Sequence, residues 1–312
     1  MIKGAIRKRE SSNLGFWRNE DTGELKDLEQ IALDLRLVSN GNGDVLSIYN
    51  QSLFESNTDK RLKGWAIHKH KIESENKIKD NFGNYVHYIY VRTPSDMNKK
   101  FKVYMLKMST SLNYNDKYIY LGSKNDPNRI LVKKDTDLMK VLDIKSRTAY
   151  ANIKNALKSS NILGRDKIGY YINPNIVLNG DIKLRAGYTR VMIEGFNELY
   201  IAEKDKTTLG YFLELIPFIN KENNILCHNP WEKELEKIIP MPLSDIANIL
   251  GVAQNNSIRL RNRLLKLKIK GMSTFGIFNR GDVKIFVVNP HLYYSGSGAG
   301  IDYLKGLFGI NN

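Results

Sequence analysis

The chain contains 312 residues, enough for roughly two domains, and 42% of them are hydrophobic, which excludes a chain that is disordered throughout. Lysine and arginine number 48 against 33 aspartates and glutamates, so the formal net charge of +15 favours an anionic partner, either nucleic acid or an anionic membrane surface. The single cysteine, Cys227, excludes a disulfide framework and a four-cysteine zinc site, and fits a reducing, cytoplasmic location. We expect neither a membrane-spanning segment nor a secretory signal, because no apolar run approaches the required length.

The first 93 residues are expected to form a small α+β region that begins with a loose basic arm at residues 1–10. Gly15–Arg18 and Glu24–Leu25 flank an Asp-Thr-Gly turn signal, which predicts a hairpin. Leu28–Val38 shows helical periodicity, and a turn cluster follows it at 40–44. Tyr85–Val91 is rich in aromatic and β-branched residues and therefore predicts a strand. No pattern in this region assigns it a role.

A metal site at His68 and His70 has to be weighed. In a strand these histidines would share a face, and rolling-circle initiators use two such histidines to hold a metal beside a nucleophilic tyrosine. His87 or Glu73 would be the third ligand, but Lys69 lies where that motif has a bulky apolar residue. No phosphate-binding Gly-x-x-x-x-Gly-Lys-Ser/Thr loop and no His-Glu-x-x-His or Ser-His-Asp spacing occurs. We therefore expect no enzymatic activity, no catalytic or metal-binding residues and no cofactor.

The second half of the chain contains an internal repeat. Ile172-Asn173-Pro174 recurs as Val288-Asn289-Pro290, at an offset (290 − 174) of 116 residues. Upstream, apolar helical patterns begin at Thr136 and at Ser244, at an offset (244 − 136) of 108 residues. Each copy reads as a short helix, a turn, a longer basic helix, a hairpin and the Asn-Pro segment. The second copy is the longer one, and we expect its extra residues in the hairpin, where insertions are tolerated.

This order of elements is typical of a helix-turn-helix followed by a wing, in which a short helix braces a second helix for insertion into a major groove. The apolar segments Phe101–Met108 and Leu209–Ile219 supply each copy with a first helix. We therefore predict an α+β protein with two tandem winged helix-turn-helix domains, at residues 94–186 and 187–300. Residues 301–312 are expected to form a short C-terminal tail helix. The alternative is a duplicated α+β module that binds another protein.

Basic residues are concentrated in the two copies. Residues 129–168 hold ten basic and four acidic side chains, and residues 243–287 hold eight and two, so each segment has a net charge of +6. Together they carry 12 of the 15 net positive charges, whereas residues 187–242 are net acidic. This distribution favours a protein that contacts DNA at two places. At helical spacing, the basic side chains form two stripes, Arg147, Lys154 and Lys158 in the first copy and Arg259, Arg263 and Lys266 in the second.

The expected DNA contacts follow from position. Polar and basic residues at the start of each longer helix, Arg259 among them, suit base readout, whereas cations on the hairpins suit phosphate. Ser146 is also the expected N-cap of its helix, and Arg261 lies between apolar rows and is expected only to snorkel. The expected DNA-binding residues of the first copy are Lys145, Ser146, Arg147, Thr148, Lys154, Lys158, Arg165 and Lys167. Those of the second copy are Gln254, Asn255, Asn256, Ser257, Arg259, Arg263, Lys266, Arg280 and Lys284.

The two Asn-Pro segments, Ile172-Asn173-Pro174 and Val288-Asn289-Pro290, carry a family resemblance together with their preceding helices. They resemble the winged-helix domains of plasmid and phage replication-initiator (Rep) proteins of low-GC Gram-positive bacteria. The tandem arrangement is similar to that of iteron-binding initiators with two winged helices. The resemblance covers about residues 95–296, and it implies recognition of a replication origin on double-stranded DNA.

Three functions stay open on the sequence alone. Origin recognition for a plasmid or phage is the expected one, and a transcription regulator of a phage or mobile element would use the same surface. An assembly or polymerase-associated factor would instead bind protein through the acidic middle segment and the N-terminal region. The expected partners are double-stranded DNA and host replication or transcription proteins, without a membrane, and a homodimer also stays open.

Overall fold

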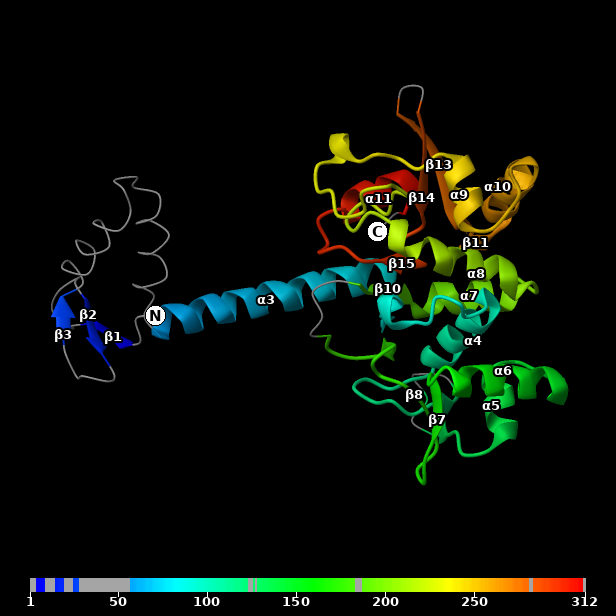
Figure 1. Ribbon diagram of the computed structural model, residues 1–312, viewed down its shortest axis with the longest axis horizontal. Coiled ribbons are helices and arrows are strands. Elements are labelled where there is room, and N and C mark those ends of the chain that lie inside the picture. Colours follow the sequence, from blue (N-terminus) through cyan, green and yellow to red (C-terminus); the bar gives the residue numbers. More distant parts are fainter. Residues whose placement is uncertain are drawn as a thin grey trace. The chain divides into compact units, whose positions relative to one another are not determined.

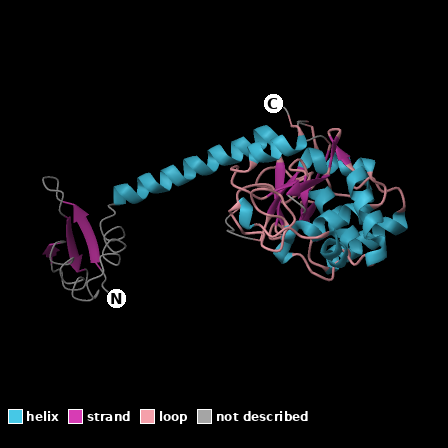
Figure 2. Ribbon diagram, turned by 90° about the horizontal axis from the view of Figure 1, so that it is seen from above, coloured by secondary structure: helices cyan, strands magenta, loops and turns pink. Residues whose placement is uncertain are grey.

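The structure, a computed structural model, describes residues 4–8, 15–19, 25–27, 57–122, 126, 128–182, 187–280 and 283–310. Contacts between its elements divide the chain into two units, Met1–Glu73 and Ser74–Asn312. Helices and small sheets occur together in the second unit, so the fold is of the mixed α and β kind expected from the sequence (Figure 1 and Figure 2).

Three strands of the first unit form an antiparallel sheet in the order β1 (Gly4–Lys8), β2 (Gly15–Asn19) and β3 (Leu25–Asp27). The pairing of β2 with β3 confirms the predicted hairpin. Residues 4–8 were expected in a loose arm, but they pair with β2 over their full length. The helix expected at Leu28–Val38 and the turn expected at 40–44 lie outside the described residues.

Helix α3 runs from Asn57 to Phe82 and contains His68 and His70. The metal hypothesis needed these histidines in a strand, and that placement is wrong. The strand geometry that would place both histidines on one face is therefore absent. In the last turn of α3, Ile78 and Phe82 are four residues apart, and both are buried in the second unit.

The first copy of the repeat begins with strand β4 (Tyr85–Tyr88), which ends earlier than expected because Tyr90–Arg92 form a 3-10 helix. The predicted first helix is α4 (Lys99–Ser109). A short strand pair, β5 (Tyr120–Leu121) and β6 (Ile130–Leu131), precedes helices α5 (Asp135–Val141) and α6 (Arg147–Ser159). The hairpin of β7 (Leu163–Arg165) and β8 (Tyr170–Ile172) follows, and β9 (Val177–Leu178) ends the copy.

The second copy repeats this order with additions. Strand β10 (Thr189–Met192) leads into an extra helix, α7 (Ile193–Ala202), and then into α8 (Lys206–Leu215), which a 3-10 turn at Ile216–Phe218 extends. After a 3-10 turn at Leu235–Lys237 come α9 (Leu243–Ile249), a 3-10 turn at Gln254–Asn256 and α10 (Ser257–Lys266). Strands β11 (Lys268–Ile269) and β12 (Met272–Ser273) precede the hairpin of β13 (Phe275–Arg280) and β14 (Val283–Val288). Strand β15 (Tyr293–Tyr294) and the predicted tail helix α11 (Ile301–Phe308) end the described chain.

The two copies meet in one four-stranded sheet of order β15-β10-β4-β9. At its centre β4 and β10 pair antiparallel, with His87 opposite Arg190. Each central strand also bonds to its outer neighbour in the same way. The Ile89 N–H, just after β4, donates to the Ile176 carbonyl just before β9 at 2.8 Å, and the Met192 N–H of β10 donates to the Leu292 carbonyl just before β15 at 3.0 Å. On either side of this pair, Val86 pairs with Val191 and Tyr88 pairs with Thr189. A local twofold axis through the His87–Arg190 pair therefore relates β4 and β9 to β10 and β15.

Helices α4 and α8 pack against each other on this sheet and give the two copies a common core. Gly210 of α8 lies so close to α4 that a Cβ atom there would stand 2.9 Å from the Lys99 carbonyl oxygen. Lys102 of α4 forms an ion pair with Glu214 of α8, with Nζ 2.9 Å from Oε1. Strand β4, which precedes residue 94, belongs to the same sheet. The domain boundaries expected at 93/94 and 186/187 stay predictions.

The repeated asparagines, Asn173 and Asn289, make the same hydrogen bonds in both copies. Each backbone N–H donates to a carbonyl at the start of the hairpin, that of Ile162 at 2.8 Å or of Thr274 at 2.9 Å. Each side-chain Nδ2 donates to the preceding carbonyl at 3.0 Å, and each Oδ1 accepts from the N–H two residues later. The Asn-Pro segment recurs because it closes the base of each hairpin and precedes the strand, β9 or β15, that joins the central sheet.

The turn between the short and the long helix is also the same in both copies. Asp143 and Gly251 each follow the helix C-cap with positive φ angles of 49° and 67°. The N–H of the next residue then donates to the carbonyl five residues back, from Ile144 at 3.0 Å and from Val252 at 2.9 Å. These bonds form a Schellman motif, which satisfies the last carbonyls of the first helix. The motif sets the angle at which α6 and α10 leave α5 and α9.

The extra residues of the second copy are divided between two places. The asparagine side chain bridges 12 residues in the first hairpin and 16 in the second, so four residues lengthen the hairpin as expected. The remaining difference lies before the hairpin, where β11 and β12 form a small strand pair that the first copy lacks among its described residues. The expectation that the hairpin takes the insertion is therefore half confirmed.

Candidate nucleic-acid interface

Fifteen of the seventeen expected DNA-binding residues are exposed, and the other two, Lys154 and Ser257, are half-buried. All of them lie on α6, α10, the segments just before these helices, or the two hairpins. The sequence therefore located solvent-facing positions correctly in both copies. Their side-chain contacts separate cations that are available to a ligand from cations that the fold already uses.

The start of α6 gathers cations around a shallow hollow of about 390 Å3 that Lys140, Lys145, Arg147 and Asp143 help to line. The Ser146 Oγ accepts a hydrogen bond from the Ala149 N–H at 3.2 Å, which confirms the predicted N-cap. The first N–H groups of a helix carry a partial positive charge, which adds to the field of Lys145 and Arg147, whereas Lys140 is paired with Asp137 at 3.9 Å. This end of α6 suits an anionic group such as a backbone phosphate.

Lys154, in contrast, belongs to a hub of hydrogen bonds around Asp135, the first residue of α5. Its Nζ lies 2.7 Å from Asp135 Oδ2, and the Tyr150 and Tyr170 hydroxyl groups donate to Oδ1 of the same carboxylate. Burial alone would raise the pKa of Asp135, but these hydrogen bonds lower it from 3.8 to about 2. Lys154 therefore ties α6 to α5 and to β8, and its charge is largely neutralised.

Arg263 is engaged in a similar way in the second copy. Its Nη2 forms an ion pair with Asp205 Oδ2, and Asp205 is also the N-cap of α8, accepting from the Thr207 N–H at 2.9 Å. Arg259 and Lys266, on the same stripe, are exposed, and no carboxylate among the described residues forms an ion pair with them. The free charge of this stripe is therefore smaller than its sequence indicates.

The two basic stripes do not occupy equivalent helix faces. Ile153 and Leu157 are buried in α6 as Leu260 and Leu264 are in α10, at a constant offset (264 − 157) of 107 residues. By this offset, Arg259 and Lys266 correspond to Asn152 and Ser159, and Lys154 corresponds to Arg261. The stripes therefore lie on opposite flanks of the buried face. The spacing of charges alone does not show this, but the spacing of the buried apolar residues does.

In each hairpin, one cation contacts other groups of the protein and another is exposed to solvent. At the first tip Asp166 accepts from the Ile168 N–H at 2.9 Å, which leaves Lys167 exposed, and the Arg165 guanidinium lies 5.2 Å from the centre of the Tyr170 ring. In the second hairpin Arg280 donates to the carbonyl oxygens of residues 235 and 238, both at 2.9 Å. Arg280 therefore fastens the 235–238 turn to β13, whereas Lys284 of β14 is exposed.

One feature was missed at the level of the sequence. Arg261, expected only to snorkel, is half-buried and lines a hollow of about 280 Å3 together with Lys284. The correspondence of Arg261 with Lys154 is the signal that would have drawn attention to it.

Within the described residues, no helix is both long and apolar enough to cross a membrane, and no group of three or more His, Cys, Asp or Glu side chains is arranged to hold a metal ion. Comparisons with protein-family models, with curated proteins and with solved structures found no match.

Proposed function

We propose that the protein binds double-stranded DNA through two tandem winged helix-turn-helix modules, at residues 85–178 and 189–294. The observation that carries this proposal is the repetition. The same Schellman turn between two helices and the same asparagine-closed hairpin occur twice, and each time exposed cations lie on the second helix and on the hairpin. A fold that presents a helix and a hairpin side by side suits a major groove and its flanking phosphates.

The contacts sort the candidate residues by role. Lys145 and Arg147 at the start of α6 would hold phosphate, as would Lys158 in its last turn. Asn255, in the 3-10 turn just before α10, and Arg259, near the start of α10, are exposed where they would reach base edges. Lys154, Arg263 and Arg280 would contribute less, because each already has partners within the protein.

The local twofold axis predicts the arrangement of the target. We propose that the same axis relates α6 to α10, so that the protein would read two half-sites of inverted orientation in successive major grooves, roughly 34–36 Å apart. The half-sites would differ in sequence, because the exposed faces of α6 and α10 carry different side chains.

Recognition of a plasmid or phage replication origin in the cytoplasm is the biological role that we propose, in keeping with the resemblance to Rep proteins. Regulation of transcription would use the same surface, and host replication or transcription proteins would be the further partners. Selection of bound fragments from a library of the source genome distinguishes the two roles. Fragments that hold clustered repeats support origin recognition, and fragments that hold a promoter support regulation.

DNA binding itself is tested by measuring affinity for the selected duplex against salt concentration. Each phosphate that the protein neutralises adds about 0.9 to the slope of log affinity against log salt, and roughly six to ten contacts are expected for two modules. The pair Arg147→Ala with Lys158→Ala should weaken one half of the footprint, and Arg259→Ala with Lys266→Ala the other half.

Lys233→Ala with Lys305→Ala is the matched control, since it removes two positive charges from segments outside the helices and hairpins of both copies. It should leave the footprint unchanged. Salt-independent affinity, or an equal loss from the control pair and from both test pairs, would rule out the proposed interface and favour the protein-binding alternative.

A further inference from the structure

The second copy has a cation at the position of Lys154 but no carboxylate at the position of Asp135. Arg261 of α10 takes the position of Lys154 in α6, by the offset of 107 that the buried leucines define. Leu243, the first residue of α9, takes the position of Asp135, the first residue of α5. The ion pair that ties the helices together in the first copy therefore has only its positive member in the second.

The hydroxyl groups of the hub are also replaced. Phe286 takes the position of Tyr170, since each lies three residues before the repeated asparagine. Ser257 takes the position of Tyr150 at the offset of 107. Both tyrosines donate to the Asp135 carboxylate in the first copy, whereas the Phe286 ring has nothing to donate. The second copy therefore has neither the carboxylate nor the Tyr170 hydroxyl group, and a shorter serine side chain replaces Tyr150.

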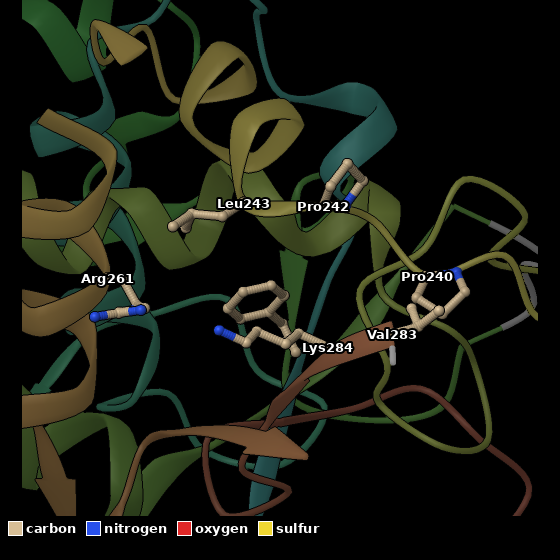
Figure 3. A pocket seen from close by; sticks show the side chains of 7 residues that line it. Pro240, Pro242, Leu243, Arg261, Val283 and Lys284 are labelled. Atoms are coloured by element: carbon tan, nitrogen blue, oxygen red, sulfur yellow. The ribbon is translucent and has the colours of Figure 1, made fainter. Parts of the chain in front are cut away.

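A hollow lies where the second copy has these different side chains. A hollow of about 280 Å3 lies between α10, the start of α9 and β14, with walls formed by Pro242, Leu243 and Phe286. Figure 3 shows that the side chains of Arg261 and Lys284 extend into this space from α10 and from β14. The Arg261 guanidinium donates only to the neighbouring Asn262 side chain, at 3.2 and 3.3 Å, among the described residues. Two cations therefore line an apolar hollow with no carboxylate of the described chain between them.

We propose that this hollow binds a carboxylate carried on an apolar stem, either a free organic acid or an acidic side chain beside an aromatic residue of a peptide. The carboxylate would take the place that the Asp135 carboxylate has in the first copy and would accept hydrogen bonds from Arg261 and Lys284. A guanidinium offers two parallel donors to a carboxylate, which favours this pairing. The stem would lie against Leu243 and Phe286. This site lies apart from the proposed DNA contacts at the start of α6 and α10, and it shares Lys284 with the hairpin cations expected to contact phosphate.

The walls favour a carboxylate on an apolar stem over a phosphate of the DNA backbone. Proline, leucine and phenylalanine offer no hydrogen bond, so a phosphate pressed against them would lose its water without replacement. An apolar stem gains free energy from the same walls, because its own surface leaves water.

The test uses the full-length protein without DNA and 3-phenylpropionate as the probe. Nuclear magnetic resonance signals of the arginine side chains and of the backbone report binding. We expect saturable shifts at Arg261, Leu243 and Phe286 with 3-phenylpropionate. The uncharged 3-phenylpropionamide and inorganic phosphate, at matched ionic strength, should each bind at least ~10-fold more weakly. A short acetylated Phe-Glu peptide amide, compared with the free acid, shows which of the two sources the site prefers.

Two variants test the assignment, with one matched control. Arg261→Gln should weaken the probe at least ~10-fold because it removes the charge and keeps much of the side-chain volume. Leu243→Asp should abolish binding, because it restores the carboxylate of the first copy, and an aspartate is favourable in the first turn of a helix. Arg259→Gln, on the same helix but not in the hollow, should change affinity by less than ~2-fold.

Equal affinity for the acid and its amide would show an apolar hollow without anion recognition, and equal affinity for phosphate would show a general anion site. Either result overturns the proposal, as does unchanged binding in Arg261→Gln. The absence of shifts with both the free acid and the peptide also overturns it. None of these outcomes bears on DNA binding, which the footprint experiment measures separately.

Discussion

The Asp135 hub gives the sharpest prediction about stability. Asp135→Asn keeps the shape of the side chain and lets Oδ1 go on accepting from Tyr150 and Tyr170, but it removes the charge that Lys154 faces. The Lys154 side chain is 22% exposed, so its ammonium group would be left partly buried without a counter-charge. We therefore expect Asp135→Asn to lower the free energy of unfolding at neutral pH.

The magnitude follows from the pKa of Asp135, which falls from 3.8 to about 2 in the folded chain. A shift of this size corresponds to roughly 2.4 kcal/mol at full effect. The Asp135 side chain is 46% exposed, so solvent screening reduces the expected loss to about 1 kcal/mol. For a unit of this size, that loss corresponds to a fall of roughly 2–4 °C in the unfolding temperature.

The assay is urea unfolding at a series of pH values, followed by circular dichroism. Because the folded pKa of Asp135 is lowered, its contribution is complete above 3.8 and disappears as the pH falls toward 2. The difference between the wild type and Asp135→Asn should therefore shrink over that interval. Asp137→Asn is the control, since Lys140 lies 3.9 Å from it in an i,i+3 pair whose lysine side chain is 66% exposed. An effect of Asp135→Asn that stays constant from pH 7 to 2, or one that the control matches, would refute the role of the hub.

Three further predictions follow. Gly251→Ala should lower the free energy of unfolding by about 1 kcal/mol and Asp143→Gly should raise it by a similar amount, because both positions have positive φ. Thermal unfolding of the two variants should therefore show shifts of opposite sign. Asn289→Ala should cost roughly 1–3 kcal/mol in urea unfolding, because it leaves the Ser273 carbonyl and the His291 N–H without their side-chain partner, whereas an unchanged midpoint would show that the Asn-Pro closure is dispensable. Lys158→Ala should reduce the salt slope of DNA binding by about 0.9 and Lys154→Ala by much less, and equal reductions would show that the ion pair with Asp135 opens on DNA.

The sequence carried enough information to predict the repeated elements. The apolar spacing at Leu138, Val141 and Leu142 predicted a helix with those side chains inward, and all three are buried in or beside α5. The Asn-Pro segments stood out because each asparagine has three hydrogen-bonding tasks in the fold. Such a residue is fixed by local geometry, and local geometry is what a sequence pattern records.

Long-range partners could not be predicted in the same way. Lys154 and Arg263 look like free cations on a helix wheel, but their acids, Asp135 and Asp205, lie 19 and 58 residues away in the sequence. The place of β4 could not be predicted either, since its pairing with β9 and β10 shows that it belongs with the repeat. Helix periodicity fixes which side of a helix is buried, but it does not say which charges find a partner across the fold.

The pairing of β4 with β10 has a consequence for how the two halves can differ. The register is the one that two identical subunits would form in an isologous dimer, so a single copy would leave its β4 edge open to another molecule. Joining the halves in one polypeptide makes this association intramolecular and independent of protein concentration. It also removes the constraint that both halves carry the same side chains. One half can then fill its polar centre with Asp135 while the other half keeps that centre vacant.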